Sequence, residues 1–141
     1  MNHMTNLYIM FFIMLLSGFL ATMNVWANSI NDIRFSLNDV YMVLLMTGWM
    51  FSFMGVFYRD YSSFLLGVIL VCFNVWCIRT QFMVSQQQFL QGMIPHHSMA
   101  IHMSKKVLEN TDTTKNRNFK TFVENIIKTQ ADEIQRMKKM L

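Results

Sequence analysis

Three apolar stretches, each close to the length of a membrane-spanning helix, constrain this chain more than any other feature. They run from Leu7 to Trp26, from Leu37 to Phe57 and from Tyr61 to Ile78, and none carries a charge in its interior. A helix needs about 20 apolar residues to cross the hydrocarbon of a bilayer. Each stretch is therefore predicted to be a transmembrane helix, and Arg59-Asp60 leaves room only for a tight turn between the second and third.

The distribution of charge indicates that the two halves of the chain belong in different environments. Only 14% of the 141 residues are charged, and most of the 12 Lys and Arg residues follow Arg79. In the tail they alternate with acidic residues along helical faces, which favours solvated surfaces over a nucleic-acid-binding patch. We therefore expect an all-α protein with a three-span transmembrane region at 1–80 and a helical domain at 81–141, outside the lipid.

The first stretch has an alternative interpretation as a cleaved signal peptide, because Val25-Trp26-Ala27 resembles a cleavage site. A signal peptide begins with Lys or Arg residues, and neither precedes Leu7. We therefore expect an uncleaved anchor. The few basic residues near the spans do not orient them, but three spans require the amino terminus and the tail to lie on opposite sides of the membrane.

The tail is predicted to contain two helices that pack against each other. Ser85 followed by Gln88 has the form of a capping box, which predicts that the first helix begins there. This helix should run to about Glu109, with a kink at Pro95. A polar loop at Asn110–Asn116 follows, and we expect the second helix to extend from there to the carboxyl terminus.

The second helix of the tail has one apolar stripe with polar interruptions. Its residues are spaced by three and four positions, which is typical of a helix with one buried face. The stripe consists of Phe119, Phe122, Val123, Ile126, Ile127, Ile134, Met137 and Leu141. Gln130 and Glu133 lie on the same side, so we expect them to point toward the first helix.

The first helix of the tail has two neighbouring rows that are predicted to be buried, each with a histidine at its centre. One row is Phe89, Met93, His96, Ala100, Met103 and Val107, and the other is Leu90, Ile94, His97, Ile101, Ser104 and Leu108. The opposite row is predicted to face solvent and comprises Gln91, Pro95, Ser98, His102 and Lys106.

This seam would bring together imidazole nitrogen, thioether sulfur and carboxylate oxygen, all of which bind metal ions. The candidate ligands are His96, His97, Met93, Glu133, Met137 and Met103. Soft sulfur ligands favour Cu(I) or Ag(I). The alternative is that both histidines are neutral and only fix the pairing of the helices, because buried polar groups need hydrogen-bond partners in either case.

The tail resembles the domain of unknown function 305 family. The segment Phe89–Ile101, FLQGMIPHHSMAI, matches a Met-Ile-x-His-His helix, and Gln130–Met137, QADEIQRM, matches the Gln-x-x-Glu-Ile-x-x-Met helix that follows it in that family. The whole chain resembles a bacterial subgroup with three membrane helices before these motifs. The resemblance implies a ferritin-like helical domain, exported from the inner membrane to the periplasm or cell exterior, and copper or silver binding. Gln86 stands where the family commonly has an acidic residue, so a site that uses that carboxylate would be altered.

These observations lead to a function hypothesis and one alternative. A two-helix tail buries little apolar surface alone, so it should pair with a second copy in a four-helix arrangement or lean on its own membrane helices. Of these, we expect a homodimer. The expected function is membrane-anchored binding of copper or another soft metal, in copper handling or tolerance, with a metal transporter as candidate partner. The alternative is a structural membrane protein whose polar seam only fixes helix pairing. An enzyme is not expected, since the sequence has no Ser-His-Asp arrangement and no glycine-rich phosphate loop.

Overall fold

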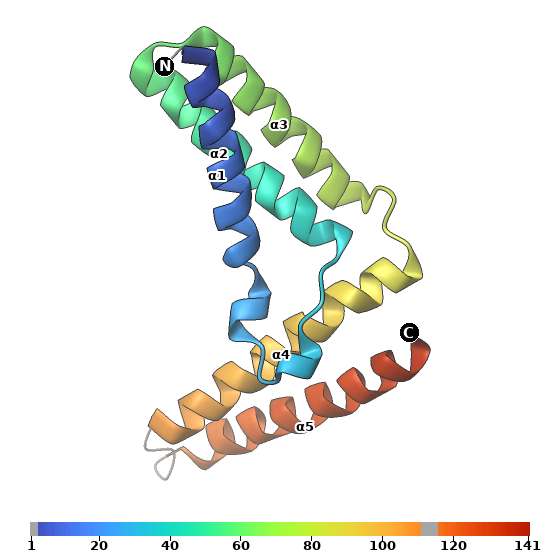
Figure 1. Ribbon diagram of the computed structural model, residues 1–141. Coiled ribbons are helices and arrows are strands. Elements are labelled where there is room, and N and C mark those ends of the chain that lie inside the picture. The colour runs from blue at the N-terminus through green and yellow to red at the C-terminus, as the bar shows by residue number, and fades with distance from the viewer. Residues whose placement is uncertain (1–2, 111–115) are drawn as a thin grey trace. The chain divides into compact units, whose positions relative to one another are not determined.

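The computed structural model describes residues 3–110 and 116–141, and within them every regular element is helical. The elements are α1 (His3–Leu20), the 3-10 turns η1 (Met23–Trp26) and η2 (Ile30–Asp32), α2 (Leu37–Tyr58), α3 (Tyr61–Thr80), α4 (Gln86–Asn110) and α5 (Arg117–Met140) (Figure 1). They form two compact units, the first from residues 1–22 and 37–84 and the second from 23–36 and 85–141. The predicted all-α fold class is confirmed for the described residues.

The first unit contains helices that suit a lipid environment. The segments Tyr8–Trp26, Leu37–Tyr58 and Tyr61–Thr80 are long and apolar enough to cross a membrane. Large apolar side chains on their outer sides are exposed, for example Phe12 at 68% and Leu65 at 60%. Exposed apolar surface of this kind is expected where lipid, not water, surrounds a helix. The three predicted spans are therefore present as helices.

The first helix ends earlier than the sequence predicts, at Leu20 instead of Trp26. The side-chain amide of Asn24 donates to the carbonyl oxygen of Arg34 at 2.8 Å and accepts from its backbone N–H at 3.1 Å. This pairing holds the chain after α1 against the residues that precede α2. Residues 23–26 therefore form the turn η1 and belong to the second unit.

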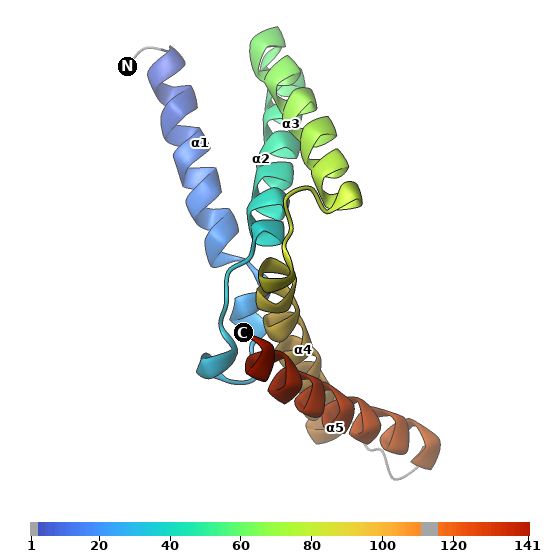
Figure 2. The same ribbon diagram turned by 90° about the vertical axis from the view of Figure 1, so that its right-hand side faces the viewer.

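Small residues let α2 and α3 pack at close range, and the two helices run side by side in Figures 1 and 2. A Cβ atom added at Gly67 would lie 2.4 Å from the backbone nitrogen of Ser52, and one added at Gly55 would lie 2.4 Å from that of Phe64. Both distances are far below van der Waals contact. Close approach through small residues is typical of helix pairs in membranes.

Replacing Gly67 with Leu should force α2 and α3 apart, because the new side chain has no space against the backbone of Ser52. We expect the free energy of unfolding to fall by more than about 2 kcal/mol, measured by titrating the detergent-solubilised protein with SDS while following helicity. Val75→Leu is the matched control, since Val75 is 43% exposed on the same helix. Equal stability of the two variants would show that the close packing does not exist.

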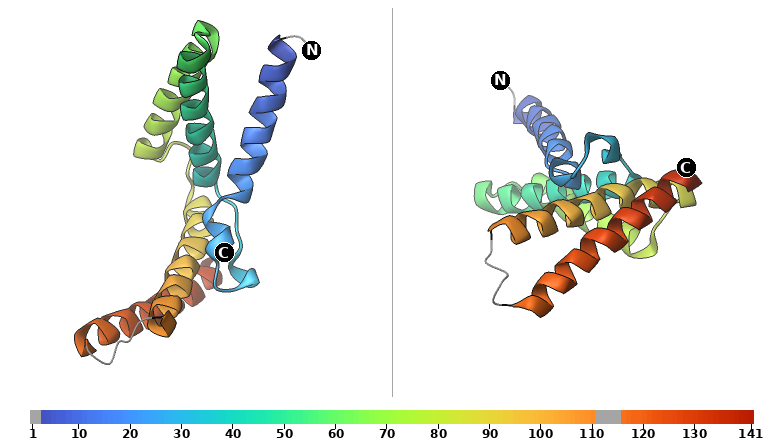
Figure 3. Two further views of the ribbon diagram at one scale, coloured as in Figure 1. Left: turned by 90° about the vertical axis from the view of Figure 1, so that its left-hand side faces the viewer. Right: turned by 90° about the horizontal axis from the view of Figure 1, so that it is seen from below.

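The second unit is built on α4 and α5, which lie side by side and antiparallel (Figure 3). The hydroxyl of Ser85 accepts from the backbone N–H of Gln88 at 3.3 Å, so the predicted start of α4 is confirmed. The helix continues through Pro95 to Asn110, and residues 111–115 of the predicted loop lie outside the described residues. The side chain of Asn116 accepts from the N–H of Phe119 at 3.0 Å and caps α5.

This unit is larger than the tail 81–141 that the sequence suggests, because it includes residues 23–36, which connect α1 to α2. We call this segment the strap. It contains η1 and η2, and both turns pack against α4. The strap therefore gives α4 a second neighbour in addition to α5.

The strap changes which rows of α4 are buried. The row with Ile94, His97 and Ile101 faces the core as predicted. The row that includes His96 is largely exposed, and Phe89 and Met103 in it are each 50% exposed, so the prediction that it is buried was wrong. Pro95 and Ser98 were predicted to face solvent, yet both are fully buried. The physical reason is that the strap covers the side of α4 on which Ser98 lies.

Candidate functional site

The centre of the second unit is a contact between His97 of α4 and Glu133 of α5. The Nε2 atom of His97 lies 2.8 Å from Oε2 of Glu133. The Nδ1 atom lies 2.8 Å from the carbonyl oxygen of Met93, one turn earlier on the same helix. The side chain of His97 is only 11% exposed, whereas that of Glu133 is 50% exposed. Glu133 thus connects a buried imidazole to the surface.

The hydrogen bonds of His97 determine what its second ring nitrogen can do. A carbonyl oxygen can only accept, so Nδ1 must carry a hydrogen and donate to Met93. The proton in the contact between Nε2 and Glu133 then belongs to an imidazolium or to a carboxylic acid. When that proton is absent, a nitrogen lone pair and a carboxylate oxygen face each other. These two atoms could both bind a cation as ligands. We call the pair the His97–Glu133 seat.

Packing explains why His97 lies at this position. Ile94, Ile101 and Ile134 form the core between the two helices, and Ile127 and Met137 pack against it. His97 is one turn from both isoleucines of α4, so it is held in the same contact surface. Glu133 directly precedes Ile134, which places its carboxylate at the edge of that core.

The other predicted ligands are distributed unevenly around this pair. His96 is exposed, and its ring centroid lies 5.8 Å from that of His97 with the ring planes at 71°. Met93 is half-buried and holds His97 through its carbonyl oxygen, Met137 packs in the core, and Met103 is 50% exposed. Among the described residues, no group of three His, Cys, Asp or Glu side chains could hold a metal ion. The described part of one chain therefore brings His97 and Glu133 together without a third ligand of these types.

A second polar cluster ties the strap to both helices, and sequence reasoning missed it. Ser98 donates to Oδ2 of Asp32 at 2.7 Å and accepts from the backbone N–H of Asn28 at 2.9 Å. Lys138 of α5 forms an ion pair with the other oxygen of Asp32, whose side chain is 8% exposed. Lys105 donates to the side chain of Asn28 at 3.0 Å. Strap, α4 and α5 thus meet at the buried carboxylate of Asp32.

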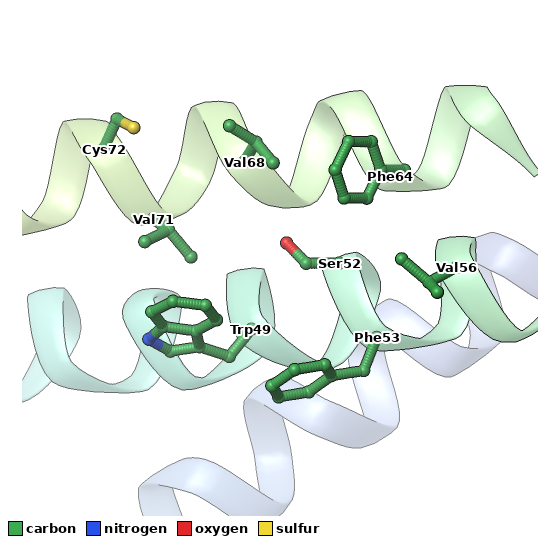
Figure 4. A pocket seen from close by; sticks show the side chains of 8 residues that line it. All are labelled: Trp49, Ser52, Phe53, Val56, Phe64, Val68, Val71 and Cys72. Carbon is green, nitrogen blue, oxygen red and sulfur yellow. The ribbon is translucent and has the colours of Figure 1, made fainter.

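The first unit contains an apolar groove between α2 and α3, with a volume of about 360 Å³. Figure 4 shows the side chains that line it, which are Trp49, Ser52, Phe53, Val56, Phe64, Val68, Val71 and Cys72. The hydroxyl of Ser52 is already bonded to the carbonyl oxygen of Gly48 at 2.9 Å. The groove thus has no convergent polar groups, and we assign the candidate site to the second unit.

Comparison with known proteins finds a family match and a relative for this chain. Residues 79–141 match the family model described as "Domain of unknown function (DUF305)". The chain is also 42% identical over 130 residues to "Uncharacterized protein L153" of Acanthamoeba polyphaga mimivirus, an alignment that covers 89% of this chain and 84% of that protein. The chain belongs to the DUF305 family. No solved structure matches it.

The DUF305 match includes α4 and α5, because it begins near the end of α3 and continues to Leu141. Both His97 and Glu133 lie within it. The alignment with the mimivirus protein is longer than the DUF305 domain and includes more of the chain. The strap precedes the DUF305 match in sequence, although it folds with that domain.

Removing the Asp32 carboxylate should release the strap from α4 and α5. In Asp32→Ala the ammonium of Lys138 loses its buried partner, so we expect the free energy of unfolding to fall by about 2–4 kcal/mol. Amide hydrogen exchange in residues 23–36, followed by mass spectrometry, should accelerate in the folded protein.

The control for this prediction is a surface pair in the same unit. Lys106 and Glu109 form an ion pair with side chains that are 55% and 57% exposed. Lys106→Ala should therefore lower the free energy of unfolding by less than about 1 kcal/mol. It should leave amide hydrogen exchange in the strap unchanged. Equal exchange rates in the two variants would contradict the role assigned to Asp32.

Proposed function

We propose that this protein is a membrane-anchored metal-binding protein whose second unit takes up a soft metal ion, with copper as the preferred candidate. One observation carries the proposal: Nε2 of His97 and Oε2 of Glu133 converge at 2.8 Å while Nδ1 is held by a backbone carbonyl. Histidines that bind metals commonly donate their other N–H to such a carbonyl, which fixes the tautomer and the ring orientation. The role is binding, without catalysis.

The chemistry of the nearby side chains supports a soft ion. Met93 lies one helical turn before His97, and Met137 lies one turn after Glu133. Their thioethers could supply sulfur to an ion held by the imidazole, and sulfur ligands favour Cu(I) and Ag(I) over harder cations. In this proposal His97 is the central ligand, Glu133 is the second, and a methionine contributes the sulfur.

The cellular setting is also part of the proposal. We place the second unit on the exported side of a membrane, as in the bacterial inner-membrane proteins that the sequence resembles, with a metal transporter as the candidate partner and copper tolerance as the process. The mimivirus relative makes a membrane of viral or host origin an alternative to a bacterial one. The three apolar helices suit either setting, because both provide a bilayer.

A titration with Cu(I) tests the proposal. The full-length protein in detergent is titrated against a chelator of known Cu(I) affinity, and His97→Gln should weaken the affinity by at least about 100-fold, equivalent to about 2.7 kcal/mol. His102→Gln is the matched control, because His102 lies on the same helix but on the side of Ser98. It should bind as tightly as the unchanged protein.

A structural role for the same residues is the second candidate function. The His97–Glu133 contact and the packing of Met137 against the isoleucines also stabilise the pairing of α4 with α5 without any metal. On that hypothesis His97→Gln lowers the melting temperature, and Cu(I) binds the unchanged protein and the variant equally weakly. That combined result would replace metal binding with a structural function.

A further inference from the structure

One side of the α4–α5 pair carries large apolar side chains that are 38–62% exposed. We call it the open face and define it by Phe89, His96, Met103 and Val107 of α4 with Phe119 and Phe122 of α5. The strap lies against a different side of α4, where Pro95 and Ser98 are buried. Phe122 is 62% exposed and Met103 is 50% exposed.

The His97–Glu133 seat lies at the edge of this face. His96 adjoins His97 on α4, and the carboxylate of Glu133 is half-exposed. On α5, Phe119, Phe122, Ile126 and Glu133 follow one another at spacings of three, four and seven residues, so they share one side of the helix. The open face therefore combines an apolar surface with the imidazoles and the carboxylate of the proposed site.

We infer that a second copy of this chain covers the open face, and that the two copies together complete the metal seat. In a four-helix arrangement each helix needs a wide apolar stripe, because it contacts two neighbours. We call the row with Ile94, His97 and Ile101 the core row, and the row with Phe89, His96 and Met103 the open row. Both rows of α4 are apolar at most positions, so its apolar stripe has this width. The buried core between α4 and α5 in one copy takes its α4 residues from the core row.

A second copy fits the chemistry of the face better than other occupants do. A two-fold contact is self-complementary, so each His96 can approach the other copy's Glu133. A helix face that lies on lipid is normally bordered by basic residues, whereas this one has the half-exposed carboxylate of Glu133 at its edge. Two copies anchored in one membrane are also held at a high effective concentration, which favours their association.

Pairing would also add ligands to the two that the described part of one chain brings together. One chain brings together the two donors of His97 and Glu133, and no group of three among the described residues. Two copies double this set and add both exposed His96 imidazoles. This inference rests on the proposed function, and it specifies one shared ion for two chains.

The test measures mass and metal stoichiometry in the full-length protein in detergent, by light scattering after size-exclusion chromatography. We expect a dimer that binds one Cu(I) per two chains. Phe122→Glu should yield a monomer with at least about tenfold weaker Cu(I) affinity. Ile30→Glu is the matched control, because Ile30 is 84% exposed on the strap and lies outside the open face. It should remain dimeric with unchanged affinity.

A cross-linking experiment covers the case in which Phe122→Glu fails to fold. With Cys72 replaced by Ser, a mixture of His96→Cys chains and Glu133→Cys chains should form a disulfide between copies on oxidation, because the proposed contact brings these two positions together. A mixture of Ile30→Cys chains and Glu133→Cys chains should not. A monomeric unchanged protein, or one ion bound per monomer, would overturn the shared seat and leave the proposed function in place. A dimer without Cu(I) affinity would overturn the proposed function, and the shared seat with it, while the pairing itself would stand.

Discussion

The buried carboxylate of Asp32 holds the second unit together. It lies in the strap, and it bonds to Ser98 of α4 and Lys138 of α5, so three segments that are far apart in sequence meet at one side chain. Burial of a charge is costly unless the charge is paired and hydrogen-bonded, and Asp32 has both kinds of partner. Because these bonds are directional, they determine the side of α4 on which the strap lies, and therefore which rows of α4 stay open.

The contact between strap and α4 also bears on how the three apolar helices could cross a membrane. The strap precedes α2, and α4 follows α3, so the two segments can meet only if the chain between them crosses an even number of times. Crossings by both α2 and α3 satisfy this condition.

Local signals in the sequence predict most of the helices, but they do not predict which segments pack against each helix. The uninterrupted apolar stretches and the Ser85–Gln88 cap are contained within a few residues, and the structure has helices at each of these places. The strap cannot be predicted in this way, because Asp32 and Lys138 are 106 residues apart in the chain. Asp32 in a loop and Ser98 in a polar row both suggest solvent exposure until the long-range contact is known.

The strap also explains why only one of the two adjacent histidines is buried, although the sequence predicts that both are. Sequence spacing assigns both to a buried seam, since either row of α4 could face α5. With the strap on the side of Ser98, the row of Ile94 and Ile101 becomes the core, and only His97 is buried there. His96, one residue earlier, is rotated by about 100° around the helix and lies on the exposed side. One imidazole thus belongs to the core of a single copy, and the other remains available on the open face, which is the arrangement that a site shared between two copies requires.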